Sequence, residues 1–270
     1  MRSKIKEAGR IVIKVGTSTL TYENGKTNLA NVEKLVRKLA DLSNRGKEII
    51  LVSSGAVGIG MGVLGIDKRP DAVNERQAIA AVGQSELMHL YSKLFSEFGV
   101  VVGQILLTRD AFSNTSMRGN VKNTFNSLLE KGVIPIVNEN DSVATEELEF
   151  DEVNSFSEND MLSALVAVLT ESELLILLSD IDGFYTGDPR EDKNARILGT
   201  VTDINGEIKK FAGGNGTGRG TGGMVTKLNA AKLCMENNIN LVIAHGGDMD
   251  NIEGIISGKT IGTLFAGSIV

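Results

Sequence analysis

Short apolar runs and longer amphipathic stretches alternate along the chain. Runs rich in Val, Ile and Leu, with the length of buried strands, lie at 10–15, 48–53, 100–108, 133–138, 173–179 and 240–245. Apolar residues recur at helical spacing over 28–45, 71–98, 117–131, 160–170 and 224–237. Strands that alternate with helices predict an α/β fold with a mostly parallel central sheet covered on both faces.

Length, composition and charge fit one large globular domain over residues 1–270. Hydrophobic residues make up 41% of the chain and charged residues 23%, and the formal net charge is -6. This charge argues against a nucleic-acid partner. No apolar run approaches the length of a membrane span, and the N-terminus lacks the apolar centre of a signal peptide, so we expect a cytoplasmic protein without membrane segments.

Polar, glycine-bearing segments follow five of the predicted strands. They read KVGTS, VSSGA, VNENDS, LSDIDG and AHGGD. Each alone is an ordinary turn between a strand and a helix. In a parallel sheet, however, all five lie at the carboxyl edge, which is where such folds bind ligands. Their content of Ser, Asn and Asp favours one shared site.

The stretch GTGRGTGGMVTK, residues 216–227, contains five glycines among its twelve residues and ends on Lys227 as a helical pattern begins. Backbone N–H groups freed of side chains, next to a helix start and a lysine, suit a phosphate group. A solvated surface loop is the alternative. The stretch is not a Walker A motif, because Leu228 follows the lysine.

A second glycine motif, GMGVLG at 60–65, matches the dinucleotide-binding pattern GxGxxG. That fingerprint needs its first glycine directly after a strand, whereas the predicted strand ends near Ser53. Close packing of helices explains the glycines equally well. A dinucleotide-dependent oxidoreductase is therefore a weaker alternative.

The remaining candidate residues suit phosphoryl transfer. Lys14 lies within an apolar strand, either on a solvated face or buried with an anionic partner. The acids of NENDS (138–142) and SENDM (157–161) suit a cationic substrate group, a hydrated Mg²⁺ ion or a helix cap. With only His89, His245 and Cys234, a zinc site or a nucleophilic dyad has few candidates.

Six segments together resemble the amino acid kinase family, in the family's order and over essentially the whole chain. They read IVIKVGTSTL, LVSSGAVGIG, IPIVNENDSV, ENDMLSALVA, LLSDIDGFYTGDPR and GTGRGTGGMVTKL. Within the family, the resemblance is to members that phosphorylate the γ-carboxylate of L-glutamate with ATP, the first step of proline biosynthesis. It implies an open α/β/α sandwich, with the glutamate site mainly in 1–170 and the ATP site mainly in 171–270.

The resemblance also assigns roles to individual positions. The catalytic positions that it implies are Lys14, Lys227 and Asp160, the acid orienting the two lysines. The implied glutamate-binding positions are Ser54, Gly55, Asn138, Asp141 and Asn159. The implied ATP-binding positions are Lys14, Ser179, Asp180, Thr221, Gly222, Gly223, Met224, Val225, Thr226 and Lys227. Mg²⁺ is implied as bound through phosphate and water, without protein ligands.

Further expectations follow from the resemblance. Proline is expected as a feedback inhibitor, and the protein as a homo-oligomer, a dimer or tetramer, that lacks the C-terminal PUA domain of many relatives. The chain departs from the family pattern at Ser179 and Glu158, and its segment 146–159 is longer than usual. The alternatives are another family member acting on a different carboxylate or phosphate acceptor, and a catalytically inactive amino-acid sensor.

Overall fold

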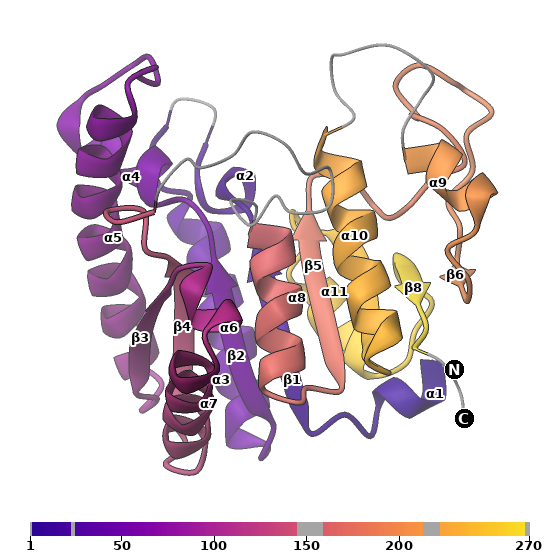
Figure 1. The fold of residues 1–270 in the computed structure, drawn as a ribbon, viewed down its shortest axis with the longest axis horizontal. Coiled ribbons are helices and arrows are strands. Elements are labelled where there is room, and N and C mark those ends of the chain that lie inside the picture. Colours follow the sequence, from indigo (N-terminus) through magenta and orange to yellow (C-terminus); the bar gives the residue numbers. More distant parts are fainter. Residues whose placement is uncertain (1, 23–24, 145–158, 213–221, 268–270) are drawn as a thin grey trace. The chain divides into compact units, whose positions relative to one another are not determined.

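The computed structural model describes residues 2–22, 25–144, 159–212 and 222–267 (Figure 1). Eight strands form one sheet in the order β3-β4-β2-β1-β5-β7-β8-β6. The pairs β2–β4, β3–β4, β5–β7 and β6–β8 are parallel, and β7–β8 is antiparallel. The predicted α/β class with a mostly parallel sheet is confirmed.

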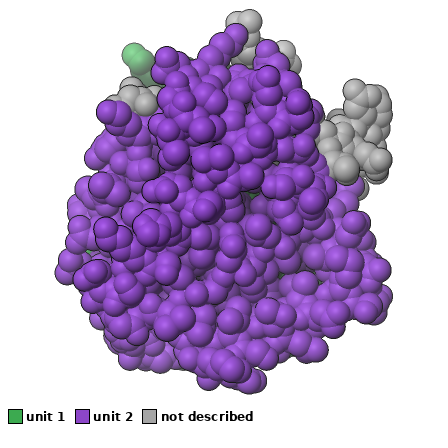
Figure 2. Space-filling model, turned by 90° about the vertical axis from the view of Figure 1, so that its left-hand side faces the viewer, with its two compact units in different colours: residues 1–13, 150–270 green, residues 14–149 purple. Residues whose placement is uncertain are grey.

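The chain contacts divide it into two compact units. Unit 1 comprises Met1–Ile13 and Phe150–Val270, and unit 2 comprises Lys14–Glu149 (Figure 2). The boundary falls within strand β1, Arg10–Val15. The expectation of one domain, with a change of site near residue 170, remains a prediction. Among the helices that the structure describes, none is both long and apolar enough to cross a membrane.

Unit 2 contains three of the predicted strands and three of the predicted long helices. Its elements are α2 (Thr17–Leu20), α3 (Leu29–Asn44), β2 (Glu48–Ser53), α4 (Ala56–Leu64), α5 (Val73–Ser96), β3 (Val102–Leu107), α6 (Asp110–Ser113), α7 (Thr115–Leu129) and β4 (Ile134–Glu139). The Asn28 side chain caps α3 by accepting a hydrogen bond from the Asn31 backbone N–H at 3.2 Å. Leu35 and Leu39 of the apolar stripe that predicted this helix are fully buried, whereas Leu29 at its start is 60% exposed.

Unit 1 holds the remaining elements. They are α1 (Arg2–Ile5), α8 (Asn159–Leu169), β5 (Leu174–Ser179), β6 (Thr200–Val201), α9 (Gly206–Ala212), α10 (Gly222–Glu236), β7 (Asn240–His245), α11 (Asp250–Ile256) and β8 (Thr263–Phe265). Helices α8 and α10 pack side by side (Figure 1). All six residues of β5 are buried, as expected of a central parallel strand. Cys234 is a free, buried thiol in α10, as its helical pattern predicted.

One side chain of the N-terminal helix α1 binds backbone groups in the C-terminal part of unit 1. The Arg2 guanidinium donates four hydrogen bonds to backbone carbonyl groups, at 2.8–3.1 Å. The acceptors are the carbonyl oxygens of Gly199, Lys259, Ile261 and Gly262. Ile5, at the end of α1, is 1% exposed. The first turn of the chain is therefore integrated into unit 1.

The glycines of GMGVLG have structural roles within and after α4. An added Cβ atom at Gly60 would lie 2.1 Å from the Ile79 carbonyl oxygen of α5. One at Gly62 would lie 2.7 Å from the Gly25 carbonyl oxygen, and Gly65 caps α4 in the left-handed region at φ 67°. The interpretation as close helix packing is thus confirmed. Because Gly60 lies inside a helix, the motif also lacks the strand–turn–helix setting of a dinucleotide site.

We expect Gly83→Ala to destabilise the protein by about 2 kcal/mol, because overpacking typically costs 1–3 kcal/mol. A Cβ atom there would lie 1.8 Å from the Ala56 carbonyl oxygen and 2.5 Å from the Gly60 nitrogen, and both are backbone atoms. At this chain length, the loss lowers the melting temperature by about 4–8 °C.

Gly119→Ala is the matched control for this variant. Gly119 lies exposed in α7, and an added Cβ atom would meet nothing within 4 Å. This change removes only the helix penalty of glycine, about 0.5–1 kcal/mol, so its melting temperature should stay level or rise. Equal melting temperatures for the two variants would contradict the packing argument.

Candidate active site

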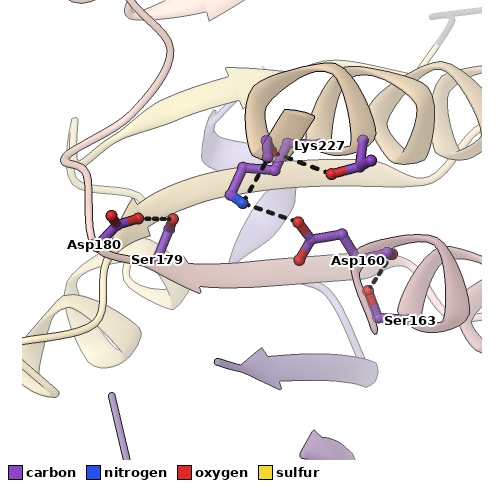
Figure 3. Close-up of polar contacts among 7 residues, drawn as sticks. Asp160, Ser163, Ser179, Asp180 and Lys227 are labelled. Atoms are coloured by element: carbon purple, nitrogen blue, oxygen red, sulfur yellow. Dashed lines mark hydrogen bonds and ion pairs between the residues drawn. The ribbon is translucent and has the colours of Figure 1, made fainter. Parts of the chain in front are cut away.

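The N-terminal turn of α8 presents a buried acid to α10. The Asp160 side chain is 5% exposed, and its carboxylate oxygen Oδ2 lies 2.9 Å from the Lys227 ammonium nitrogen (Figure 3). The Ser163 hydroxyl donates to the Asp160 carbonyl oxygen at 2.6 Å, within the same helical turn. A helix does begin in SENDM, but it begins at Asn159, and Asp160 lies in its first turn with its carboxylate paired to a lysine of another helix.

Lys227 extends from the second turn of α10. Its side chain is 12% exposed, and Nζ also donates to the Gly223 carbonyl oxygen at 3.1 Å. Two acceptors thus hold one ammonium group beside the start of the helix. An ion pair this far removed from water is strongly oriented, and removing one partner leaves a buried charge.

The carboxyl end of β5 contributes a further polar pair to unit 1. The Ser179 hydroxyl donates to the Asp180 carboxylate at 3.0 Å (Figure 3). The Ser179 carbonyl oxygen accepts the Gly246 backbone N–H at 2.7 Å, and Ser179 is in register with His245 of β7. The segments LSDIDG and AHGGD therefore do meet at one edge of the sheet.

The helix α10 begins with two glycines, as the sequence predicts for a phosphate-binding turn. Gly222 is its first residue, and an added Cβ atom at Gly223 would meet nothing within 4 Å. Thr226 is 6% exposed and its hydroxyl donates to the Gly223 carbonyl oxygen at 3.1 Å. The first N–H groups of a 15-residue helix lack intrahelical acceptors and favour an anion. Thr221, Glu158 and the stretch 216–220 lie outside the described residues.

In unit 2, Lys14 is buried near the end of β1. Its side chain is 9% exposed, so the alternative of a solvated strand face is wrong. The Lys14 ammonium nitrogen lies 3.7 Å from the position that a Cβ atom would occupy at Gly16. A Cβ atom at Gly16 would therefore be in ordinary van der Waals contact with this ammonium group. The motif KVGTS thus places a lysine amine over a glycine at the carboxyl edge of the sheet.

The turn after β2 lies against the turn after β1. The Ser54 backbone N–H donates to the Val15 carbonyl oxygen at 3.0 Å. Gly55 has φ 103°, a left-handed conformation that a side chain would strain, and it caps the N-terminus of α4. An added Cβ atom at Gly58 would lie 2.9 Å from the Thr17 methyl group. The expected convergence of KVGTS and VSSGA is confirmed within unit 2.

The carboxyl end of β4 carries two carboxyl groups with raised pKa values. Burial, and to a lesser extent the charge of the neighbouring Asp141 carboxylate, together raise the pKa of Glu139 to about 7. Burial also raises the pKa of Asp141, while a hydrogen bond from its own backbone N–H and the charge of Arg69 act in the opposite direction. Asp141 lies in a turn, with no helix starting between 140 and 144, so the helix-cap interpretation of this acid is wrong.

Asn138, also in β4, is 3% exposed, and its amide nitrogen donates to the Gln84 side-chain oxygen at 2.8 Å. The sequence did not single out Gln84, and it indicated Glu139 only as one of the two acids of NENDS. Gln84 lies in the buried stripe of α5 together with Ala80, Leu87 and Tyr91. The position of Gln84 in an otherwise apolar helical stripe could have indicated a buried hydrogen bond, because a buried amide needs a partner.

Comparison with known proteins gives the family. The Amino acid kinase family matches residues 9–245, most of the chain. The chain belongs to the amino acid kinase family. Glutamate 5-kinase from Clostridium perfringens is 52% identical over 265 residues, covering 98% of both chains. Glutamate 5-kinase from Listeria monocytogenes is 54% identical over 266 residues, covering 98% of this chain and 96% of the relative.

Two solved structures share the fold. UMP kinase from Bacillus anthracis superimposes with a TM-score of 0.62 at 16% identity, covering 95% of both chains. UMP kinase from Ureaplasma parvum gives a TM-score of 0.62 at 17% identity, covering 94% of this chain and 97% of that one. At such identity the likeness concerns the amino acid kinase fold alone.

Proposed function

We propose that the chain is a glutamate 5-kinase, which transfers the γ-phosphoryl group of ATP to the γ-carboxylate of L-glutamate and forms L-glutamyl 5-phosphate. The observation that carries the phosphotransferase part is the buried pair of Lys227 and Asp160 beside the glycine-led start of α10. The choice of glutamate rests on full-length relatives of that name at 52–54% identity.

The reaction needs charge stabilisation rather than a general base. The γ-carboxylate of glutamate has a reference pKa of about 4.3 and is ionised at neutral pH, so no proton has to be removed from the nucleophile. Phosphoryl transfer depends mainly on positioning and on neutralising the phosphoryl oxygens. Lys227, oriented by Asp160, is proposed for that role. Lys14 of unit 2 is proposed as the second cation.

The nucleotide would bind to unit 1. We assign the phosphates to the backbone N–H groups at the start of α10, and further nucleotide contacts to Ser179 and Asp180. Mg²⁺ would come with the nucleotide through phosphate oxygens and water. Among the described residues, no three or more His, Cys, Asp and Glu side chains are grouped to hold a metal ion. When bound, the ion would neutralise negative charge on the nucleotide phosphates.

Glutamate would bind mainly to unit 2. We assign its α-ammonium group to Asp141 and its further contacts to Ser54, Gly55 and Asn138, with Asn159 at the start of α8 as an additional contact. The raised pKa of Asp141 supports this role, because a buried carboxylate gains most from a cationic partner.

The assay that tests the function is ADP release dependent on L-glutamate. The purified protein with Mg²⁺ and ATP should release ADP when L-glutamate is added, and hydroxylamine should trap the acyl phosphate as a hydroxamate. UMP and N-acetyl-L-glutamate serve as controls for other phosphate and carboxylate acceptors. Turnover with either of these, and not with glutamate, would overturn the assignment in favour of another family member. Absence of turnover with all three would favour the inactive sensor.

We also propose regulation by proline, assembly into a dimer or tetramer, and a cytoplasmic location. Proline, as the end product of the pathway, should compete with glutamate and raise its KM without changing the KM for ATP. Initial rates at several proline concentrations in the millimolar range measure this. A rate independent of proline would remove the regulatory proposal and leave the kinase assignment in place.

A further inference from the structure

Two buried hydrogen bonds connect α5 to strand ends that carry proposed glutamate-binding residues. The Asn138 amide nitrogen donates to the Gln84 side-chain oxygen at 2.8 Å, and both side chains are buried. The Ser53 hydroxyl oxygen, directly before Ser54, lies 2.9 Å from the Tyr91 hydroxyl oxygen. Both of these side chains are fully buried. Side chains of α5 thus fix the ends of β2 and β4.

The two connections form one arrangement. Gln84 and Tyr91 are seven residues apart, so they lie on the same face of α5, two turns from each other. Strands β2 and β4 are parallel, with Val52 in register with Val137, and Ser53 and Asn138 are the residues that directly follow these two. One helix face therefore supports two adjacent positions at the carboxyl edge of the sheet.

The chemistry of an amide gives this contact a consequence for binding. An asparagine side chain has one end that donates and one that accepts hydrogen bonds, and these ends exchange when the amide turns over. An ammonium group donates only, so it requires the oxygen end. Because the Asn138 amide nitrogen donates to Gln84, the Asn138 amide oxygen is the end that faces away from this contact.

We infer that Gln84 is a positioning residue for glutamate binding: it holds the Asn138 amide in the orientation whose oxygen accepts from the α-ammonium group of the substrate. The inference rests on the proposed function. Gln84 acts through Asn138, and its burial at 9% exposure is consistent with an indirect role. Nucleotide binding, assigned to unit 1, should be unaffected.

The test compares three variants by steady-state kinetics with both substrates. Gln84→Met keeps the length of the side chain and removes the acceptor. We expect it to raise the KM for glutamate about 10-fold, the equivalent of one misplaced hydrogen bond to a charged group, and to leave the KM for ATP within about 2-fold. Gln84→Glu keeps an acceptor oxygen and should restore the KM for glutamate to within about 3-fold of the unaltered protein.

Leu87→Val is the control for general loosening of α5. Leu87 is fully buried on the same helix face and touches neither amide through a hydrogen bond. This variant should lower the melting temperature without raising the KM for glutamate relative to the KM for ATP. If Gln84→Met does not fold, Gln84→Asn takes its place, because it retains the amide but is one methylene too short to reach Asn138, and the same separation is expected.

The outcomes separate the inference from the function on which it rests. An unaltered protein without glutamate-dependent turnover overturns the proposed function and the inference together. An active unaltered protein whose Gln84→Met variant keeps its KM for glutamate, or raises both KM values equally, overturns the inference alone. A raised KM for glutamate that Gln84→Glu does not restore also overturns it, because the acceptor oxygen would then not be the group that matters.

Discussion

Replacing Lys227 with methionine will lower kcat by about 100-fold or more, because preorganised donors to transition-state charge each contribute about 3 kcal/mol or above. The Lys227 ammonium is held at 2.9 Å from Asp160 and 3.1 Å from the Gly223 carbonyl oxygen, so it requires little reorganisation when charge develops. Methionine retains the apolar stem and removes only the charge. Single-turnover and steady-state rates at saturating ATP and glutamate measure the effect.

The loss of the cation also leaves Asp160 buried, and breaking such a pair costs about 3–5 kcal/mol of stability. A double variant separates the two effects. Lys227→Met with Asp160→Asn removes both charges, so its melting temperature should recover while kcat stays low. Lys232→Met is the control, since Lys232 lies on the same helix with its side chain 55% exposed and should leave kcat unchanged. A double variant that regained kcat would show that Lys227 contributes only to stability.

The variant Asp141→Asn will raise the KM for glutamate about 10- to 100-fold, because charge-assisted hydrogen bonds are worth about 1.5–3 kcal/mol. The change keeps the size of the side chain and its capacity for hydrogen bonds. If Asp141 instead held Mg²⁺, the Mg²⁺ requirement and the KM for ATP would move and the KM for glutamate would not. Steady-state kinetics in which the concentrations of glutamate, ATP and Mg²⁺ are varied in turn distinguish binding of the α-ammonium group from binding of Mg²⁺.

The variant Asp141→Asn should also change the pKa of Glu139. Burial is the main reason for its pKa of about 7, and the charge of Asp141 adds to it. Removing that charge should lower the pKa of Glu139 toward its ordinary value without reaching it. Glu139 in Asp141→Asn will therefore ionise at a lower pH than in the unaltered protein. Carboxyl chemical shifts followed by NMR across pH 5–9 measure this, and an unmoved Glu139 titration would contradict the proximity of the two acids.

Hydrophobic periodicity predicted the long elements and missed the short ones. Strands β1, β2 and β7 have the residue bounds that their apolar runs predict. Helix α4 was missed because AVGIGMGVL is apolar or glycine at every position, so it has no polar face to establish a period. Strands β6 and β8 contain two and three residues, too few for any period to be recognised.

The sequence predicted which residue types form the candidate site, but it predicted fewer of the contacts between them. The polar segments after the strands predicted a site at the carboxyl edge of the sheet, because parallel strands end at the same edge. Nothing in the spacing pairs Asp160 with Lys227, which are 67 residues apart; only the resemblance to a family did so. The hydrogen bond between Asn138 and Gln84 was not predicted, because a partner 54 residues away is set by tertiary packing and not by local spacing.

The discontinuity of unit 1 has a consequence for synthesis on the ribosome. Residues 14–149 emerge as one uninterrupted segment and can make the contacts of unit 2 early, since compact units fold as they are completed. Helix α1 must wait, because the partners of Arg2 are translated late: Arg2 donates to the carbonyl oxygens of Gly199 and Gly262. Until then Ile5 remains exposed. Nascent chains that stall before residue 199 would therefore display an undocked N-terminus to chaperones and proteases.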